Sequence, residues 1–143
     1  MVTLDYDLTS LPILFSFFYF SNLTIGFFFL LFVIPRHAPE SFEKSLFRFE
    51  SDIWSYAIVL WEMYTYCKIE PYKEIDSSKG DVQELLTFLK QGKRLYRPEN
   101  CPESVYELML ECWAYQPEKR PNAKSVYLKI REIHEQQQND LLS

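Results

Sequence analysis

The sequence predicts an all-α fold, and two observations lead to this prediction. Apolar residues recur at helical intervals in several segments after residue 38, and proline or glycine separates these segments. No segment alternates apolar and polar residues as a half-buried strand does. With 143 residues, 48% of them hydrophobic, the chain is long enough for one domain with a hydrophobic core. We therefore expect a module of four or five packed helices.

The first two expected helices lie in the middle of the chain. Ser51 is a suitable N-cap for a helix over residues 52–64, whose apolar residues lie on nearly every side and predict a buried central helix. Asp81 and Glu84 match a capping box at the start of a second helix, and Gly92 marks its C-terminal end. The apolar stripe of this second helix consists of Val82, Leu85, Leu86 and Leu89.

Two more amphipathic helices are expected towards the C-terminus. Pro102 opens the first of them, and Pro117 and Pro121 precede the second. The buried face of the first is expected to consist of Val105, Leu108, Met109, Cys112 and Trp113. The buried face of the second is expected to consist of Ala123, Val126, Tyr127, Ile130 and Ile133. The polar residues 135–140 are expected to fray into solvent.

Charge and cysteine content exclude some classes of function. The net charge of −5 and the pI near 5.1 argue against a nucleic-acid partner, because surfaces that bind nucleic acids are basic. Cys67, Cys101 and Cys112 show no CxxC spacing and are expected to be reduced thiols. This pattern favours the cytosol over a secreted, disulfide-linked domain.

The N-terminal residues 1–35 differ sharply from the rest of the chain. No charged side chain occurs between Asp7 and Arg36, and residues 11–34 would span roughly 36 Å as a helix, enough to cross a bilayer. Lys and Arg follow this stretch but none precedes it, so a single membrane-spanning helix would place the C-terminus in the cytoplasm. The alternative is translated non-coding sequence, because residues with A/T-rich codons dominate the stretch. Under either interpretation, a helical module at residues 36–136 and a polar tail at 137–143 follow.

Four short motifs occur in order within the helical module. They are Ala38-Pro39-Glu40, Ser51-Asp52-Ile53-Trp54-Ser55, Cys112-Trp113 and Pro117-Glu118-Lys119-Arg120-Pro121. These motifs match A-P-E, S-D-x-W-S and C-W-x-x-x-P-x-x-R-P of tyrosine kinases. Residues 38–134 therefore resemble the C-terminal lobe of a protein tyrosine kinase catalytic domain. The resemblance implies a helical C-lobe fold and a parent transferase that phosphorylates protein tyrosine with ATP.

Three further stretches look like the active kinase domain of Janus kinases. They are residues 63–67, 89–95 and 100–109. Residues 68–80 would then be a shortened form of that family's insertion, in which a Gly-Gln-Met stretch binds suppressor proteins. Ser78-Lys79-Gly80 stands in that place here, so the resemblance does not carry this partner over.

The resemblance assigns structural roles to five residues. It implies that Glu40 pairs with Arg120, whose planar guanidinium can bond a carboxylate through two parallel hydrogen bonds. Trp54 and Trp113 are implied anchors of the core. In kinases the aspartate at the position of Asp52 holds the catalytic loop. Without that loop, we expect Asp52 to serve only as a negative charge near a helix N-terminus.

The motifs that perform catalysis in kinases do not occur in this sequence. Phosphoryl transfer uses a glycine-rich loop, a strand lysine, H-R-D-x-x-x-x-N and D-F-G, and none of them is present. We therefore expect no catalytic, cofactor-binding or metal-binding residue in this chain, although the intact parent family uses ATP and Mg²⁺. Two hypotheses stay open: a fragment of a tyrosine kinase, and a membrane-anchored, non-catalytic interaction module. The expected partners are proteins or the missing N-terminal lobe of the kinase, and a membrane through residues 11–34.

Loss of the catalytic loop and of the helix beside it also predicts a bare face on the central helix. We expect that face to carry either Ile53, Ala57 and Leu60 or Trp54, Ile58 and Trp61. Each large apolar side chain left in water forfeits roughly 1.5–3 kcal/mol of burial. Residues 11–34 are expected to dock there when they are outside a membrane; otherwise the module is expected to aggregate or need a partner.

Overall fold

The computed structural model describes residues 34–73, 75 and 82–142. The chain divides into two units, Met1–Val33 and Ile34–Ser143, and all described residues belong to the second unit. The expected membrane-spanning stretch lies outside the described residues except for Ile34, and so does Asp81 of the expected capping box. In the part that is described, no helix is both long and apolar enough to span a bilayer.

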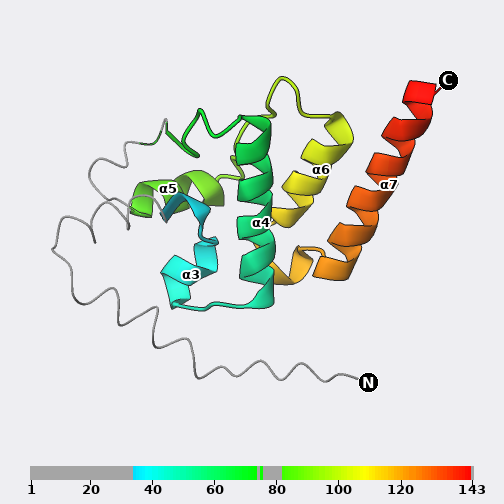
Figure 1. Ribbon diagram of the computed structural model, residues 1–143. Coiled ribbons are helices and arrows are strands. Elements are labelled where there is room, and N and C mark those ends of the chain that lie inside the picture. Colours follow the sequence, from blue (N-terminus) through cyan, green and yellow to red (C-terminus); the bar gives the residue numbers. More distant parts are fainter. Residues whose placement is uncertain (1–33, 74, 76–81, 143) are drawn as a thin grey trace, which may run out of the picture. The chain divides into compact units, whose positions relative to one another are not determined.

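The described residues form helices joined by turns (Figure 1). In chain order the elements are η2 (Ile34–Arg36), α3 (Pro39–Lys44), α4 (Phe49–Tyr64), α5 (Val82–Lys90), α6 (Glu103–Cys112), η4 (Pro117–Lys119) and α7 (Ala123–Leu142). No strand occurs within these ranges, so the predicted helical fold is confirmed for the described part of the chain.

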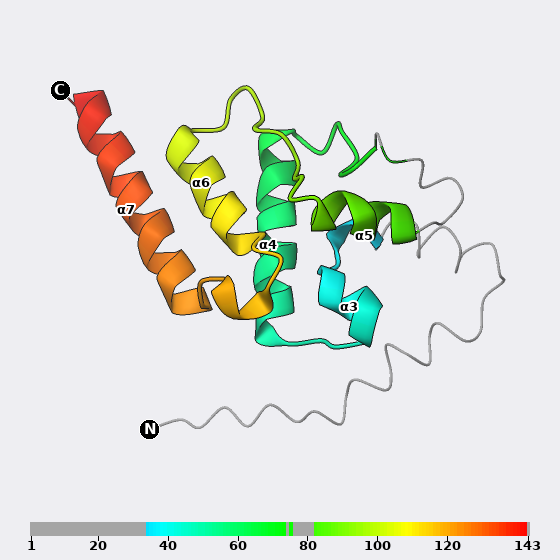
Figure 2. The same ribbon diagram turned by 180° about the vertical axis from the view of Figure 1, so that it is seen from behind.

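The helix α4 occupies the centre of this unit, as predicted (Figures 1 and 2). From α4, the helices α6 and α7 follow on one side, while α3 and α5 lie on the other. The largest fully buried side chains come mainly from α4 and from α6 with the residue after it: Trp54, Ile58, Trp61, Leu108, Met109 and Trp113. Trp61 Nε1 also donates a hydrogen bond to the backbone oxygen of Tyr96 at 2.8 Å, which holds the segment after α5 against α4.

Two of the expected amphipathic helices, α5 and α6, occur where they were predicted and bury residues of their predicted apolar faces. Leu85, Leu86 and Leu89 of α5 are buried, and Gly92 follows with a φ of +80°, the left-handed conformation that ends helices. The predicted face of α6 is buried throughout, from Val105 to Trp113. Pro102 is the N-cap of α6 rather than its first residue.

The start of α4 differs from the prediction. The helix begins at Phe49, with Arg48 as its N-cap, and Ser51 lies at the third position of the first turn instead of at the N-cap. The Ser51 hydroxyl donates to Glu40 Oε1 at 2.7 Å and accepts a bond from the backbone nitrogen of Arg48 at 3.3 Å. The Ser51 hydroxyl therefore bonds a carboxylate that is distant in sequence, whereas local capping rules predicted this serine as the N-cap.

The last helix differs from the prediction at its end and on its face. α7 continues to Leu142 instead of fraying at residues 135–140, because no glycine or proline follows Pro121 to stop it. Val126 is buried, but Tyr127 exposes 62% of its surface, since a helix turns about 100° at each residue and rotates this side chain off the buried face. Ala123 is also exposed.

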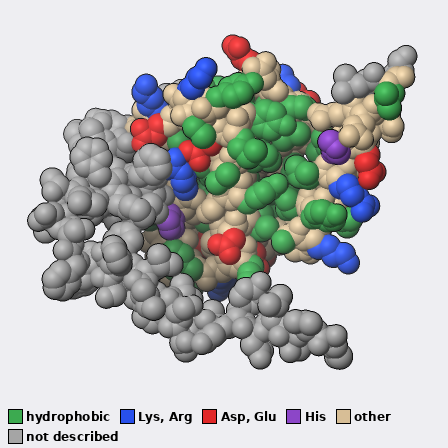
Figure 3. Space-filling model, in the orientation of Figure 1, with side chains coloured by type: hydrophobic (Ala, Val, Ile, Leu, Met, Phe, Trp, Pro, Cys, Tyr) green, Lys and Arg blue, Asp and Glu red, His purple; other side chains and the backbone are tan. Residues whose placement is uncertain are grey.

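The predicted bare faces of α4 are wrong. Trp54, Ala57, Ile58 and Trp61 are fully buried, Ile53 is buried, and Leu60 is half-buried. Among the described elements, α6, η2 and η4 make the most extensive contacts with α4. The exposed apolar residues of this helix are instead Phe49, Tyr56, Val59 and Met63. Figure 3 shows hydrophobic side chains gathered on the side of the molecule where α4 and α6 lie.

Candidate functional site

The best-defined polar site of the described structure is a buried ion pair between α3 and the turn before α7. Arg120 Nη1 donates to Glu40 Oε1 at 2.7 Å, and Nη2 donates to Oε2 at 2.8 Å. The Arg120 side chain has no exposed surface, and that of Glu40 exposes 7%. The predicted bidentate, buried pair is therefore confirmed, between residues that are 80 positions apart in the sequence.

The guanidinium also donates hydrogen bonds to backbone oxygens of two further segments. Nε donates to Ala114 at 2.8 Å, Nη1 to Glu50 at 2.8 Å and Nη2 to Tyr115 at 3.4 Å. One side chain thus joins α3, the first turn of α4 and the loop after α6. We call Glu40, Ser51 and Arg120 the clamp.

Local structure holds both halves of the clamp in place. Pro39 occupies the first position of α3, where its missing N–H costs nothing, and Ser45 ends the helix in the left-handed conformation, with a φ of 51°. On the other side, the backbone nitrogen of Arg120 donates to Pro117 O at 3.0 Å and closes the η4 turn. Pro121 follows and favours the extended backbone of Arg120.

The Glu40 carboxyl group is held in its charged form. Burial raises its pKa, but the hydrogen bonds from Arg120 and Ser51 lower it by more, so the net pKa lies below its usual value. The charge is therefore matched inside the protein, which is the condition under which a buried ion is tolerated.

Trp54 links the clamp to a half-buried cation, Arg94, which the sequence analysis did not identify. The guanidinium carbons of Arg120 and Arg94 lie 5.1 and 5.4 Å from the Trp54 ring centroid, within the range of cation–π contacts. Arg94 also donates to the backbone oxygens of Trp113 and Leu89, at 2.8 and 2.9 Å. Burial lowers the pKa of Arg94.

A second polar network, also missed, crosses from α3 to α5. Lys90 Nζ lies 2.6 Å from Glu43 Oε1, and the Tyr115 hydroxyl donates to the same oxygen at 3.0 Å. Burial, together with this carboxylate, raises the pKa of Tyr115 to about 12. The hydrogen bond from Lys90 is the main cause that lowers the pKa of Glu43. Nothing in the sequence pattern marks these three residues, because only the fold brings them together.

The other predicted site residues have different environments. Trp54 and Trp113 have no exposed surface, and their indole N–H groups have no hydrogen-bond partner among the described residues. Asp52 lies in the first turn of α4 and is exposed. In the described part of the chain its carboxylate takes part in no ion pair.

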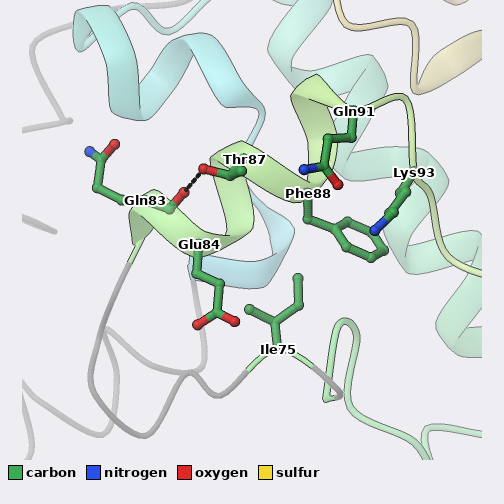
Figure 4. Close-up of a pocket in the computed structure, with 7 residues that line it drawn as sticks. All are labelled: Ile75, Gln83, Glu84, Thr87, Phe88, Gln91 and Lys93. Carbon is green, nitrogen blue, oxygen red and sulfur yellow. Dashed lines mark hydrogen bonds between the residues drawn. The ribbon is translucent and has the colours of Figure 1, made fainter.

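A surface hollow beside α5 does not resemble a catalytic centre. It has a volume near 580 Å³ and is lined by the outer side of α5 with Ile75 and Lys93 (Figure 4). Gln83 accepts a bond from Thr87 there at 2.7 Å, and the Lys93 ammonium lies 5.5 Å from the Phe88 ring centroid. Within the described ranges no group of three His, Cys, Asp or Glu residues could hold a metal ion. The geometry therefore defines a structural site, the clamp, and identifies no ligand.

Comparison with known proteins places these features in one family. Residues 31–130 match the family model for protein tyrosine and serine/threonine kinases. The chain is 40% identical over 98 residues to the tyrosine-protein kinase ZAP-70 of Mus musculus, a match that covers 68% of this chain and 15% of that protein. It is 43% identical over 96 residues to the tyrosine-protein kinase transforming protein Abl of Abelson murine leukemia virus, covering 67% and 12%.

A further match, to the NT-3 growth factor receptor of Gallus gallus, is 39% identical over 89 residues and covers 62% of this chain and 10% of the receptor. The chain thus spans only 10–15% of the length of these relatives. The chain belongs to the protein tyrosine and serine/threonine kinase family, and its helices correspond to part of a tyrosine kinase domain.

Proposed function

We propose that this chain is a C-lobe portion of a cytoplasmic protein tyrosine kinase and does not itself transfer phosphate. The observation that carries the proposal is the clamp, which ties the A-P-E segment at residues 38–40 to the R-P segment at 120–121. The parent activity is ATP-dependent transfer of phosphate to protein tyrosine. In this chain the helices keep the architecture of the lobe, and the missing N-terminal lobe or another protein is the expected partner.

The chemistry of phosphoryl transfer supports the second half of this proposal. The reaction needs the ATP phosphates covered, Mg²⁺ held and the attacking hydroxyl oriented. The sequence has three glycines, Gly26, Gly80 and Gly92, too far apart to form a phosphate-binding loop, and it has neither H-R-D nor D-F-G. ATP and Mg²⁺ are therefore cofactors of the parent family and are not expected to bind here.

Transfer of radiolabelled phosphate tests the proposal directly. The purified full chain is mixed with Mg²⁺, labelled ATP and a tyrosine peptide, with an intact tyrosine kinase as the positive control. We expect no transfer above a blank. Transfer that EDTA abolishes and that survives repeated purification would contradict the proposal.

At a finer level we propose a Janus-kinase-like parent. The support is the sequence similarity at residues 63–67, 89–95 and 100–109. Ser78-Lys79-Gly80, in the place of the family's suppressor-binding stretch, lies outside the described residues. Transcript reads that continue upstream of Arg36 test this proposal: they are expected to encode D-F-G and H-R-D in the context of Janus kinases.

The second candidate function is a membrane-anchored, non-catalytic interaction module. The observation in its favour is the stretch without charged residues between Asp7 and Arg36. Transcript reads across the codons for Pro35 and Arg36 separate the two candidates. Reads that run without a break through the apolar stretch favour the anchored module. Reads that join the codon for Arg36 to a different upstream sequence favour the kinase fragment.

A further inference from the structure

Four tyrosines in the described part of the chain expose 40% of their surface or more. They are Tyr56, Tyr66, Tyr96 and Tyr127, with exposed fractions of 40%, 68%, 49% and 62%. A phenol at the surface can meet the active site of a second protein, so each of these side chains is a candidate for modification. The backbone around each tyrosine decides which of them can enter such a site.

Three of the four tyrosines lie in backbone that is closed by hydrogen bonds. Tyr56 and Tyr127 lie inside α4 and α7, and a helix about 10–12 Å across brings its neighbouring turns into any cleft. Tyr66 lies in the turn after α4 with a left-handed φ of 55°, and the bond from Cys67 N to Glu62 O at 2.8 Å closes that turn. Backbone bonds must therefore break before any of these three phenols enters a narrow cleft.

Tyr96 differs because its backbone belongs to neither a helix nor a turn. Within residues 93–98, which contain no regular secondary structure, Leu95 is buried and Tyr96 is exposed, as in an extended chain. Pro98 restricts Arg97 to extended conformations as well. Within the described ranges the Tyr96 hydroxyl makes no hydrogen bond. The fold therefore presents a free phenol on an extended segment.

Contacts on the inner side hold this segment in place. Trp61 Nε1 donates to Tyr96 O at 2.8 Å, and the Tyr106 hydroxyl donates to Leu95 O at 2.7 Å. The Tyr96 ring meets the Trp61 ring edge-on, with the two centroids 5.7 Å apart. These contacts involve backbone oxygens and the ring but not the Tyr96 hydroxyl, so they fix the segment without occupying the reactive group.

We propose that Tyr96 is a phosphorylation site for a protein tyrosine kinase that acts on this chain in trans. The Tyr96 hydroxyl oxygen attacks the γ-phosphorus of ATP bound to that kinase, and the new Oη–P bond forms as the bond from the γ-phosphorus to the β,γ-bridging oxygen breaks. ADP leaves with that electron pair, and the phenolic proton passes to the catalytic base of the kinase. The chain is the substrate in this reaction, a role that needs no catalysis of its own.

The charges near Tyr96 in the sequence suit the product. Phosphorylation adds about −1.5 to −2 units of charge at neutral pH. No acidic residue occurs between Glu84 and Glu99, whereas Lys93 and Arg97, both exposed, lie on either side of Tyr96. The phosphate is therefore added to a basic segment, where opposite charges favour it.

Phosphorylation of the full chain by an active tyrosine kinase domain tests the proposal. The kinase is chosen because it phosphorylates two short synthetic peptides, residues 91–101 with Tyr96 and residues 122–132 with Tyr127. Mass spectrometry then measures the initial rate at each tyrosine of the folded chain with Mg²⁺ and ATP. Relative to the ratio of the two peptides, we expect Tyr96 to be modified about tenfold faster than Tyr127 or better, because only Tyr127 must leave a helix before it reacts.

Tyr96→Phe and Tyr127→Phe are a matched pair of variants, because each keeps the ring and removes one hydroxyl. The first is expected to remove most of the phosphate incorporated within residues 34–142, and the second to leave it nearly unchanged. Urea unfolding checks that both variants keep the stability of the parent chain. The absence of phosphate at Tyr96, a preference no larger than that of the peptides, or equal incorporation in the two variants would overturn the proposal. Labelling of Tyr96 that persists without added kinase would also overturn it, because the reaction would then not occur in trans.

Discussion

Both sides of α4 carry large apolar residues, but the two sides differ in what covers them. On the inner side, Trp54, Ile58 and Trp61 have no exposed surface. On the other side lies a row of exposed residues that we call the outer stripe: Phe49, Asp52, Tyr56, Val59 and Met63. Within it, Tyr56 and Val59 expose 40% and 49% of their surface. The elements that make the most extensive contacts with α4, namely η2, α6 and η4, leave Tyr56, Val59 and Met63 exposed. The inner side therefore contributes most of the apolar burial that α4 brings to this unit, whereas the outer side contributes little because it stays in contact with water.

The clamp explains why the inner side is well fixed. Arg120 bonds the backbone oxygen of Glu50 in the first turn of α4, and Ser51 in the same turn bonds Glu40. Arg36 forms an ion pair with Glu62 further along, and its backbone oxygen accepts a bond from Ser55 at 2.9 Å. These polar contacts lie away from the outer stripe.

Arg120→Ala is expected to have the largest effect on the inner side. The substitution leaves the Glu40 carboxylate buried without its cation, and breaking one member of such a pair costs about 3–5 kcal/mol. Urea unfolding followed by tryptophan fluorescence measures the loss, because all three tryptophans lie in the core of this helical unit.

Arg131→Ala is the matched control for the clamp. Arg131 lies 3.5 Å from Glu135 on the exposed surface of α7, and exposed pairs of this spacing contribute only about 0.3–0.5 kcal/mol. Similar losses of unfolding free energy from the two arginine variants would contradict a clamp that stabilises through burial.

Ile58→Ala tests the apolar part of the inner side. Ile58 has no exposed surface, and removing its side chain loses apolar burial and opens a cavity, at a cost of about 2–5 kcal/mol. Leu110→Ala, at an exposed position of α6, is the control and is expected to change the unfolding free energy by less than about 0.5 kcal/mol. If both variants unfold at the same urea concentration, the inner side does not hold the core together.

The clamp is also expected to make stability depend on pH. The pKa of Glu40 is depressed in the folded protein, so its stabilisation is present above the unfolded pKa of about 4.3 and is lost as the pH falls through the lower folded value. Glu40→Gln is therefore expected to lower stability at neutral pH and to flatten the acid side of the stability profile. Urea unfolding over a pH series measures both effects, with Glu132→Gln on the surface of α7 as the control; an unchanged acid slope in Glu40→Gln would exclude this role.

The sequence predicted the Glu40–Arg120 pair of the clamp but neither the part of Ser51 in it nor the exposed side of α4. That pair was predictable because Glu40 and Arg120 belong to motifs whose partnership in the family is implied by the resemblance. The outer stripe was not, because a helix that is apolar all round has no periodic signal to say which face the neighbouring elements cover. That choice depends on where α6 and η2 pack, which no local pattern of α4 contains.

The other features that the sequence did not predict also depend on contacts between residues far apart in the sequence. Ser51 would cap a helix by local rules, yet the Glu40 carboxylate, eleven residues away, uses its hydroxyl. Arg94 and Tyr115 enter the polar networks only through contacts that the fold creates. Local periodicity predicted the buried face of α6, because there the apolar and polar sides alternate clearly.

Val59→Ser is expected to have the smallest effect on stability and to separate the two sides of α4 most clearly. Because Val59 is already half exposed, we expect the unfolding free energy to change by less than about 0.5 kcal/mol. Binding of the apolar dye anilinonaphthalene sulfonate is nevertheless expected to fall, since the variant interrupts a continuous exposed apolar row. Tyr127→Ser, which alters an exposed residue of α7, is the control for a general loss of surface hydrophobicity. A large loss of stability in Val59→Ser, comparable to that of Ile58→Ala, would mean that the outer stripe is covered in the folded chain and that α4 has no free side.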